Sequence, residues 1–595
     1  GIAAAAARRA PGVVAVFTGK DVQADGLGFL PCIVPVKNHD GTPRGETPRA
    51  VLAPDRVRHV GDPVAMVVAE TYQAARDAAE LIEVDYDPLP AVADVYAAVQ
   101  PDAPQVWPDI KRNIIADLHF GNADETEKAF ARAAHVAKIE LVQNRLVANP
   151  MEPRAAVAEY DPASDRSTLH TSSQSVSMLR AAIGDVVLKI GDKVRVRSGN
   201  VGGAFGMKAM LHPEQPMVVW ASRKLKRAVR WTGDRSEGFL TDVQGRDHKT
   251  FAELALDKDG KFLAIRATVY ANMGAYLSQF APMIPQSVFT MMPGVYAFEA
   301  AHLHLLEVAT HTVPVDAYRG AGRPEGIYVV ERLIAIASRE LRLPPDELRR
   351  RNFIKPSQMP YTTASGTTYD SGDFESLQSR CLKEADWAGF PARREESARR
   401  GKLRGIGLTM YVERCGGVPP DSVAIKVGKD GVKVLPGTVD NGQGHTTMLK
   451  QMVSEYLGID MEMIEVSIGD SDANPGGLTG GSRFAAVIGV ATSIASAEVV
   501  DKGMDSAAKL LEAAAVDIEY KDGSYRVKGT DRNVSLFDTA AAAGGLEALH
   551  TRSAGAQTFP NGCHIVEVEI DPQTGVTRIE RYTIVDDFGR ALNPL

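Results

Sequence analysis

The chain has 595 residues, 44% of them hydrophobic and 24% charged, which is enough apolar material for about four globular domains. A formal charge of −8 argues against a surface that tracks nucleic-acid phosphates, and no run of 18 apolar residues predicts a membrane span. The four cysteines are scattered, without any C-x-x-C pair. This argues against a disulfide framework, a zinc site or an iron–sulfur cluster in this chain, and favours the reducing cytoplasm.

Residues 1–105 predict a small α+β unit. Strands are expected at 13–17 and 64–68, and a helix over 71–82 with Thr71 as its N-cap. The Pro- and Asp-rich stretch 100–109 predicts a linker. The first residues place their charges after the apolar run, unlike a signal peptide, and no initiating Met is present. We therefore expect a chain shortened at its start, and also at its end, where a strand at 582–585 runs into a loop.

From residue 110 onward, strands alternate with helices. Two apolar faces predict helices, one around Val330 and Ile334 and one around Leu449 and Val453. The Arg-rich stretch 393–404 marks an internal boundary, either a linker or a solvated helix face. Four turn segments between apolar runs predict β-hairpins, and their recurrence favours two related halves, at 159–162, 257–260, 428–431 and 571–575.

Two glycine-rich loops could carry chemistry. The first follows a strand at 194–197 and has glycines at 202, 203 and 206, so it is either a ligand-binding loop or a tight turn. It lacks the G-x-G-x-x-G fingerprint of a dinucleotide site. The second, 438–447, leads into a helix whose free amides favour an anion site. There the Gln443 amide suits a pterin edge, whereas His445 could equally be a capping or core imidazole.

Two further loops have the same character. In 316–325, Arg319 could clamp an anion, or Arg319 and Arg323 could simply pair with acidic neighbours. The fourth loop, 474–482, runs towards a helix that begins near Gly489. Because three of the four loops lead into helix starts, together they predict a large anionic ligand that is held mainly by backbone groups.

In order and spacing, these segments resemble the large subunit of the xanthine oxidase family, which includes aldehyde oxidoreductases and aerobic carbon monoxide dehydrogenases. The resemblance implies an α+β protein with an a/b hammerhead domain over 1–105. Two large molybdenum-cofactor-binding domains would follow, over 110–392 and 400–595, the second incomplete. The resemblance covers nearly the whole chain and rests on the segments 11–19, 149–154, 202–208, 317–325, 442–445 and 585–587.

The same resemblance implies roles for individual residues. Gln174 and Arg319 would be catalytic, and no protein side chain would bind the metal, because the pterin dithiolene holds it. Phe484 stands where the family often has a small hydroxyl residue, which puts one phosphate contact in doubt. The implied cofactor-binding residues are Gln174, Gly203, Phe205, Gly206, Arg319, Gly442, Gln443, Gly444, His445, Gly481 and Ser482.

The implied activity is molybdenum-dependent hydroxylation with oxygen from water. The cofactor would be molybdopterin, with the cytosine dinucleotide form as one option. Iron–sulfur and FAD-binding subunits would be partners in a dimer of heterotrimers. The family's general base, a glutamate in a G-x-G-E motif, is expected downstream of this chain. An alternative is a non-catalytic family member or fragment that serves as a scaffold; an NAD-dependent dehydrogenase would need the missing fingerprint.

Two positions narrow the substrate that the resemblance implies. Family members acting on xanthine have a glutamate after the loop lysine, whereas Ala209 follows Lys208 here. A buried polar edge of a purine would then lack a partner. Carbon monoxide dehydrogenases have a copper-binding cysteine after the loop arginine, where this chain has Gly320. An aldehyde or a non-purine N-heterocycle remains.

Overall fold

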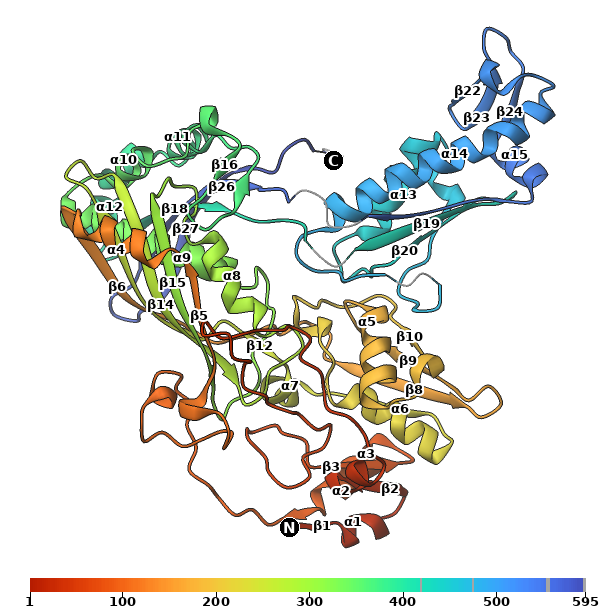
Figure 1. The fold of residues 1–595 in the computed structure, drawn as a ribbon, viewed down its shortest axis with the longest axis horizontal. Helices are drawn as coiled ribbons and strands as arrows, with labels where there is room; N and C mark the ends of the chain where they lie inside the picture. Colours follow the sequence, from red (N-terminus) through yellow and green to blue (C-terminus); the bar gives the residue numbers. More distant parts are fainter. Residues whose placement is uncertain (418–419, 474–475, 553–556, 592–595) are drawn as a thin grey trace.

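The computed structural model describes residues 1–417, 420–473, 476–552 and 557–591. The chain forms four bodies, and segments from different parts of the sequence contribute to the largest of them (Figure 1). A small N-terminal unit lies at the bottom, a body with a large sheet at the left, one α/β unit at the lower right and a second at the upper right. Across the described residues, none of the helices combines the length and the apolar character needed to cross a membrane.

The N-terminal unit is built around one antiparallel strand pair, β2 (Val13–Thr18) with β3 (Ala65–Ala69). The predicted helix is present as α3 (Tyr72–Glu80), and the Thr71 hydroxyl accepts the hydrogen bond of the Ala74 amide at 3.1 Å. Small side chains let α3 pack closely against the first residues of the chain. The other elements are β1 (Ile2–Ala3), α1 (Ala5–Arg9), α2 (Gly19–Ala24) and β4 (Glu83–Val84).

The large body contains a five-stranded sheet in the order β5-β15-β14-β13-β6. Only the β14–β15 pair is parallel. The predicted helix around Val330 is confirmed as α9 (Arg323–Leu341), which packs with α8 (Met283–Met291) against the sheet. The strands are β5 (Ile114–Gly121), β6 (His135–Gln143), β13 (His248–Leu256), β14 (Phe262–Gly274) and β15 (Ala300–Ala309).

A three-stranded sheet from later in the chain completes the large body. It consists of β18 (Leu403–Val412), β26 (Asn561–Ile570) and β27 (Thr577–Asp587), all antiparallel. Its buried residues belong to the same apolar core as the five-stranded sheet and α9. Other helices of this body are α4 (Ala123–Ala131), α10 (Pro345–Arg350) and α11 (Phe374–Glu384).

The Arg-rich stretch predicted as a boundary forms α12 (Phe390–Arg399) and the start of β18. Arg393 and Arg404 both donate hydrogen bonds to the buried carboxylate of Glu567 on β26. A buried carboxylate needs such partners to offset its loss of hydration. Most of α12 is exposed, as the solvated-face alternative expected, while Arg393, Arg400 and Arg404 bond carboxylates of β26.

The two α/β units have the same topology. The first sheet runs β10-β9-β8-β11 and the second β21-β20-β19-β25, each with one parallel pair at the same end. The expectation of two related halves is confirmed here, and all four predicted hairpins are present. The strands are β8 (Ala155–Asp161), β9 (Arg166–Thr171), β10 (Val194–Arg197), β11 (Val229–Thr232), β19 (Asp421–Val427), β20 (Val432–Pro436), β21 (Ile464–Val466) and β25 (Leu546–Arg552).

Each sheet of these units packs against helices. In the first unit they are α5 (Val176–Ala181) and α6 (Glu214–Leu225). In the second they are α13 (His445–Leu457), as predicted around Leu449, and α14 (Val490–Leu510), close to the predicted start at Gly489. A small extension at the tip contains β22 (Ile518–Lys521), β23 (Ser524–Val527), β24 (Asn533–Ser535) and α15 (Leu536–Ala543) (Figure 1).

Candidate functional site

Gln174 joins three loops through one buried side chain. It lies between β9 and α5 and is 6% exposed. Its Oε1 accepts a hydrogen bond from the Gly206 amide at 2.9 Å, and its Nε2 donates to the Thr479 carbonyl at 2.7 Å. The loop after β9, the 202–208 loop and the 476–482 loop therefore meet at this residue.

Thr479 brings in the loop that precedes α13. Its amide donates to the Gln174 carbonyl at 2.9 Å, and its hydroxyl donates to the Val439 carbonyl at 2.6 Å. The same hydroxyl accepts from the Val439 amide at 3.1 Å. Asn441 adds a second link, because its Nδ2 donates to the Ser173 carbonyl at 3.1 Å. Both α/β units thus contribute to one loop cluster.

The arginine loop approaches the same cluster through Gly206. Gly206 has φ of 111°, and a Cβ atom there would lie 2.2 Å from the Ala317 carbonyl oxygen, so only glycine permits this approach. The Arg319 amide donates to the Phe205 carbonyl at 3.0 Å. The guanidinium carbon lies 5.9 Å from the Phe205 ring centroid, and both side chains are exposed. A Cβ at Gly203 would press on the same ring, at 3.0 Å.

The two arginines of this loop have different environments. Arg323 is buried and its Nε lies 2.7 Å from the Glu413 carboxylate, so the acidic-neighbour alternative holds for it. Arg319 has no carboxylate partner among the residues described. Its backbone is fixed instead by Arg246, which donates to the carbonyls of Tyr318 at 2.9 Å and Arg319 at 2.7 Å. The Arg319 guanidinium is exposed and without a carboxylate partner among the described residues.

The segment 149–154 holds the glycine-rich loop 202–208 in place. The Glu152 carboxylate accepts hydrogen bonds from the Gly202 amide at 2.5 Å and from Lys208 Nζ at 3.1 Å. The Lys208 side chain is fully buried, and burial lowers its pKa while Glu152 opposes that change. Glu152 thus holds both ends of the loop that carries Phe205.

Three amides around the start of α13 are bonded by a carboxylate of the same loop, that of Asp440. Asp440 Oδ1 accepts from the amides of Gly442 at 2.9 Å and Gln443 at 3.0 Å, and Oδ2 accepts from Thr446 at 3.3 Å. Burial raises the pKa of Asp440, but these donors outweigh it and hold the pKa below its usual value. A carboxylate of the chain itself therefore satisfies three amides of this loop.

Gln443 and His445 differ in exposure and in the hydrogen-bonding groups that remain available to a ligand. Gln443 is exposed, and its Oε1 accepts from the Asn441 amide at 2.8 Å, which leaves Nε2 as a donor. His445 is buried, with Nδ1 3.1 Å from the Val439 carbonyl, and burial lowers its pKa. Phe484 stacks on its ring at 3.6 Å. The core-imidazole alternative therefore describes His445, and Phe484 covers it.

Ser482 lies on the rim of the cluster, three positions after Thr479. It is exposed, has φ of 51°, and its hydroxyl contacts the Cys415 thiol. The neighbouring Gly481 carbonyl accepts from the Gly416 amide at 3.2 Å. Two residues of this predicted loop, Asn474 and Pro475, lie outside the described residues.

The predicted site residues are therefore brought together by the fold. A separate cavity of about 1340 Å³ lies between the N-terminal unit and the first α/β unit, and its walls include none of them. Sequence reasoning missed Asp440, Thr479 and Arg246. Asp440 has a recognisable signal, since an Asp before a glycine-rich turn often caps it. Thr479 and Arg246 carry none, because their partners come from distant segments.

Glycine-rich backbone from three bodies thus surrounds an exposed amide, hydroxyl, guanidinium and aromatic ring. These features define a site for a large, polar organic cofactor. Family models agree. Two models for "Molybdopterin cofactor-binding domain" match residues 106–353 and 380–595. The model for "Aldehyde oxidase and xanthine dehydrogenase, a/b hammerhead domain" matches residues 1–90.

Relatives cover almost the whole chain. The carbon monoxide dehydrogenase large chain of Hydrogenophaga pseudoflava is 32% identical over 99% of this chain and 77% of its own length. The 6-hydroxypseudooxynicotine dehydrogenase complex subunit gamma of Paenarthrobacter nicotinovorans is 33% identical over 92% and 70%. The structure of quinoline 2-oxidoreductase from Pseudomonas putida 86 superposes with a TM-score of 0.91 at 31% identity, covering 100% of this chain and 78% of that one. The chain belongs to the molybdopterin-binding subunits of the xanthine oxidase family, whose members are oxidoreductases.

Proposed function

We propose that the loop cluster around Gln174 binds molybdopterin, and that the assembled enzyme hydroxylates a non-purine aromatic N-heterocycle with oxygen from water. The single observation that carries this proposal is the pair of hydrogen bonds from the Gln174 side chain to Gly206 and Thr479. They bring loops from both α/β units to one place. An aldehyde is the second substrate class that the same centre would accept.

The donor groups of the cluster fit a pterin better than a bare metal ion. Gly442 and Gly444 have positive φ, and a Cβ at either would meet nothing within 4 Å, so the floor of this loop is open. Asn441 Oδ1 is buried without a hydrogen-bond partner among the described residues. The exposed groups are an amide and a hydroxyl, Gln443 and Ser482, which suit a pterin and its phosphate.

The protein's part in the reaction is binding and orientation. When bound, the molybdenum centre supplies the oxygen nucleophile and accepts the electrons. Gln174 Nε2 uses one hydrogen for Thr479, which leaves the second to donate to the cofactor. Arg319 would place a positive charge beside the reacting region, and Phe205 would shield it from water. Glu152, Arg246 and Thr479 hold these groups in position.

The substrate class rests on the surroundings of the loop and on the relatives. Ala209 is buried in an apolar cluster with Met207, Met210, Val243 and Phe280, so it offers no partner to a purine edge. The nicotine 6-hydroxylase large subunit of Paenarthrobacter nicotinovorans is 31% identical over 100% of this chain and 75% of its own length. A cysteine does not fit at position 320, because a Cβ there would lie 2.3 Å from Pro324. Carbon monoxide oxidation through a copper-binding cysteine is therefore not proposed.

The relatives are subunits of larger complexes, which supports a proposal about partner subunits. We propose that an iron–sulfur subunit removes the electrons, that FAD lies on a further subunit, and that the complex is a dimer of heterotrimers. We also propose the cytosine dinucleotide form of the cofactor and a cytoplasmic location. All four cysteines are free, which suits a reducing compartment.

Metal analysis of the purified complex tests the proposal. We expect one molybdenum per chain, a cytosine nucleotide released by acid hydrolysis, and reduction of the partner clusters by quinoline- or pyridine-type substrates. A complex without molybdenum would overturn the proposal and favour the scaffold alternative. Turnover of aldehydes with no response to N-heterocycles would overturn the substrate class alone.

A further inference from the structure

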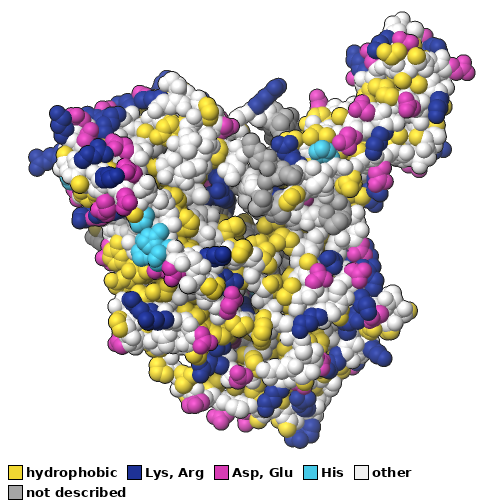
Figure 2. All heavy atoms as spheres, in the orientation of Figure 1, with side chains coloured by type: hydrophobic (Ala, Val, Ile, Leu, Met, Phe, Trp, Pro, Cys, Tyr) yellow, Lys and Arg dark blue, Asp and Glu magenta, His cyan; other side chains and the backbone are white. Residues whose placement is uncertain are grey.

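Four of the 13 histidines gather at one edge of the five-stranded sheet, although the sequence spaces them far apart. They form the cyan patch at the left of Figure 2. His119 on the edge strand β5 lies directly opposite His304 on β15. Asp117 and His302 lie two positions along from them, so all four side chains share one face of the sheet. Regular strand pairing therefore concentrates imidazoles around one carboxylate.

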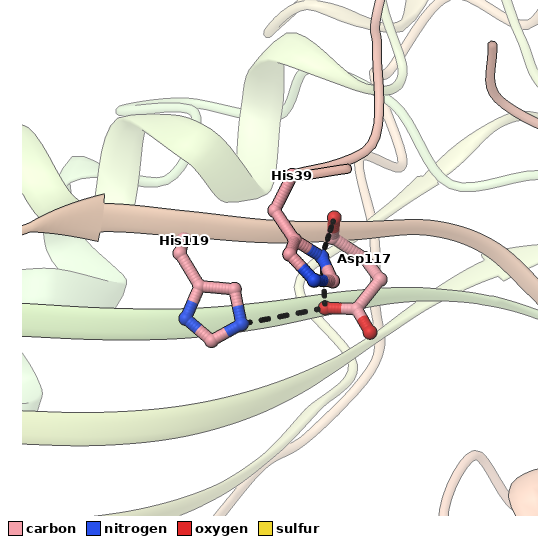
Figure 3. A group of neighbouring side chains, drawn as sticks. All are labelled: His39, Asp117 and His119. Atoms are coloured by element: carbon pink, nitrogen blue, oxygen red, sulfur yellow. Dashed lines mark hydrogen bonds and ion pairs between the residues drawn. The ribbon is translucent and has the colours of Figure 1, made fainter. Parts of the chain in front are cut away.

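A turn from the N-terminal part of the chain adds the fourth histidine. The His39 amide donates to the Asp117 carbonyl at 2.9 Å, and Asn38 Oδ1 accepts from the Asp117 amide at 2.8 Å. The turn is closed on itself, because Asn38 Nδ2 donates to Thr42 at 3.0 Å. These bonds fix His39 beside the carboxylate of Asp117 (Figure 3).

Three imidazole nitrogens converge on one oxygen, Asp117 Oδ1. The distances are 3.7 Å from His39 Nδ1, 3.7 Å from His119 Nε2 and 2.8 Å from His304 Nε2. Two ligand atoms of a tetrahedral zinc ion are about 3.4 Å apart, given bonds of about 2.0–2.1 Å. The two 3.7 Å distances to Asp117 are close to that spacing, and the donor atoms of His39, Asp117 and His119 all lie within 4.8 Å of one another.

The charges around the cluster favour a cation. Within the described chain, the ion-pair partners of Asp117 are the three histidines, with neither lysine nor arginine among them. The cluster thus offers imidazole nitrogens and a carboxylate oxygen, with no lysine or arginine among the described residues paired to that carboxylate.

We propose that His39, Asp117 and His119 bind one divalent first-row transition ion of the zinc type, while the His304 hydrogen bond orients the carboxylate. Imidazole with carboxylate suits zinc and its neighbours rather than magnesium or calcium, which prefer oxygen ligands alone. Water would complete the coordination, since His39 and His119 lie at the surface. The bound ion would connect the turn at 37–43 to β5 and so link the N-terminal segment to the large sheet.

Zinc titration of the purified full complex, after removal of loosely held metal with a chelator, tests this site. We expect calorimetry to detect one zinc equivalent per chain that His39→Asn with His119→Asn abolishes, weakening uptake by at least about tenfold. X-ray absorption at the zinc edge reports only that metal, and should give nitrogen and oxygen neighbours at about 2.0–2.1 Å with imidazole scattering. Zinc should also raise the thermal midpoint of the parent protein and not of the double variant.

Matched histidines elsewhere provide the control. His135→Asn and His550→Asn each remove a partly exposed histidine that pairs with a single glutamate, so both should keep the zinc equivalent. If the double variant does not fold, His39→Asn alone carries the test, because His39 is half exposed on a turn outside the sheet. Equal zinc uptake by parent and variant, or a zinc shell without imidazole, would overturn the proposal.

Discussion

The two α/β units share one strand order but use equivalent loops for different purposes. In the first unit, the loop 172–175 between β9 and α5 carries Gln174, whose buried amide binds other parts of the protein. In the second, the loop 437–444 between β20 and α13 carries Gln443, whose amide is exposed. The Gln174 loop holds other loops of the cluster together, whereas the Gln443 loop presents its amide at the surface.

The caps of the following helices differ in the same way. Ser175 caps α5 with a neutral hydroxyl, which accepts from the Met178 amide at 3.3 Å. Asp440 caps the longer loop before α13 with a charged carboxylate. The short loop needs one acceptor, whereas the glycine-rich loop leaves more amides to satisfy.

The second pair of equivalent loops joins the two units directly. The segment after β21 returns to β10, where the Ser198 amide donates to the Gly469 carbonyl at 2.8 Å and the Val196 amide donates to the Ser471 hydroxyl at 2.9 Å. A repeated sheet thus supplies two sets of loops that meet face to face. The proposed site lies in the loops, and the sheets position them.

Replacing Gln174, which links the loops of the cluster, should have the largest effect on molybdenum content. Gln174→Ala leaves the Gly206 amide and the Thr479 carbonyl without partners, at a cost of about 1–3 kcal/mol for each buried group. We expect the molybdenum content of the purified complex to fall by at least about tenfold. Gln443→Ala removes an exposed amide and should reduce molybdenum content only a few-fold, with the thermal midpoint unchanged.

A buried glutamine outside the site separates cofactor loss from general destabilisation. Gln378 is fully buried in the large body and donates to the Asp346 carbonyl at 3.1 Å. Gln378→Ala should lower the thermal midpoint yet retain molybdenum. If Gln443→Ala proved more damaging than Gln174→Ala, the division of labour between the two loops would be reversed.

Substitution of Thr479 tests the hydrogen bonds that hold the loop before α13 against the loop 476–482. We expect a smaller effect on molybdenum content than for Gln174→Ala. Thr479→Val keeps the side-chain shape but leaves the Val439 amide and carbonyl unsatisfied. We expect a loss of about 1–3 kcal/mol in the unfolding free energy and a few-fold lower molybdenum content. Thr492→Val is the matched control, because that buried hydroxyl donates to the Ile488 carbonyl in the turn just before its own helix and links no distant segment. Equal molybdenum loss in both variants would contradict the link.

Local pattern predicted the elements well and the contacts between them poorly. Turn residues placed all four hairpins, and Thr71 was correctly predicted as an N-cap. Glycines at 202, 203 and 206 marked a loop that other chain segments approach closely. Such signals are local, because turn type, capping and positive φ depend on a few adjacent residues.

The sequence could not reveal which distant groups satisfy the site. Asp440 bonds three amides around the start of α13, and Arg393 and Arg404 of the Arg-rich stretch bond Glu567 on a distant strand. The histidine cluster shows the same limit, since His119 and His304 become neighbours only through strand register. Metal-ligand spacing along the chain cannot detect a site that is assembled across strands.

The two caps should differ in their response to acid, and this is the smallest effect expected. The pKa of Asp440 is lower in the folded protein than in the unfolded chain, where it is about 3.9. Its stabilising contribution is therefore complete above about pH 5, and it is lost as the pH falls below the unfolded pKa and through the lower folded pKa. Between pH 6 and pH 3, the corrected hydrogen-exchange protection of residues 442–446 should fall about fivefold, the equivalent of a cap of about 1 kcal/mol. Protection at Met178, capped by a neutral serine, should not change.

Substituting the carboxylate sharpens this difference between the caps. Asp440→Asn keeps an acceptor for one amide but removes the charge, so protection of 442–446 should already be lower at pH 6 and show no further loss at pH 3. Ser175→Asp should confer acid sensitivity on the amides at the start of α5, because it gives the first unit the cap chemistry of the second. An Asp440→Asn protein that loses protection in acid as strongly as the parent would show that another group controls the loop.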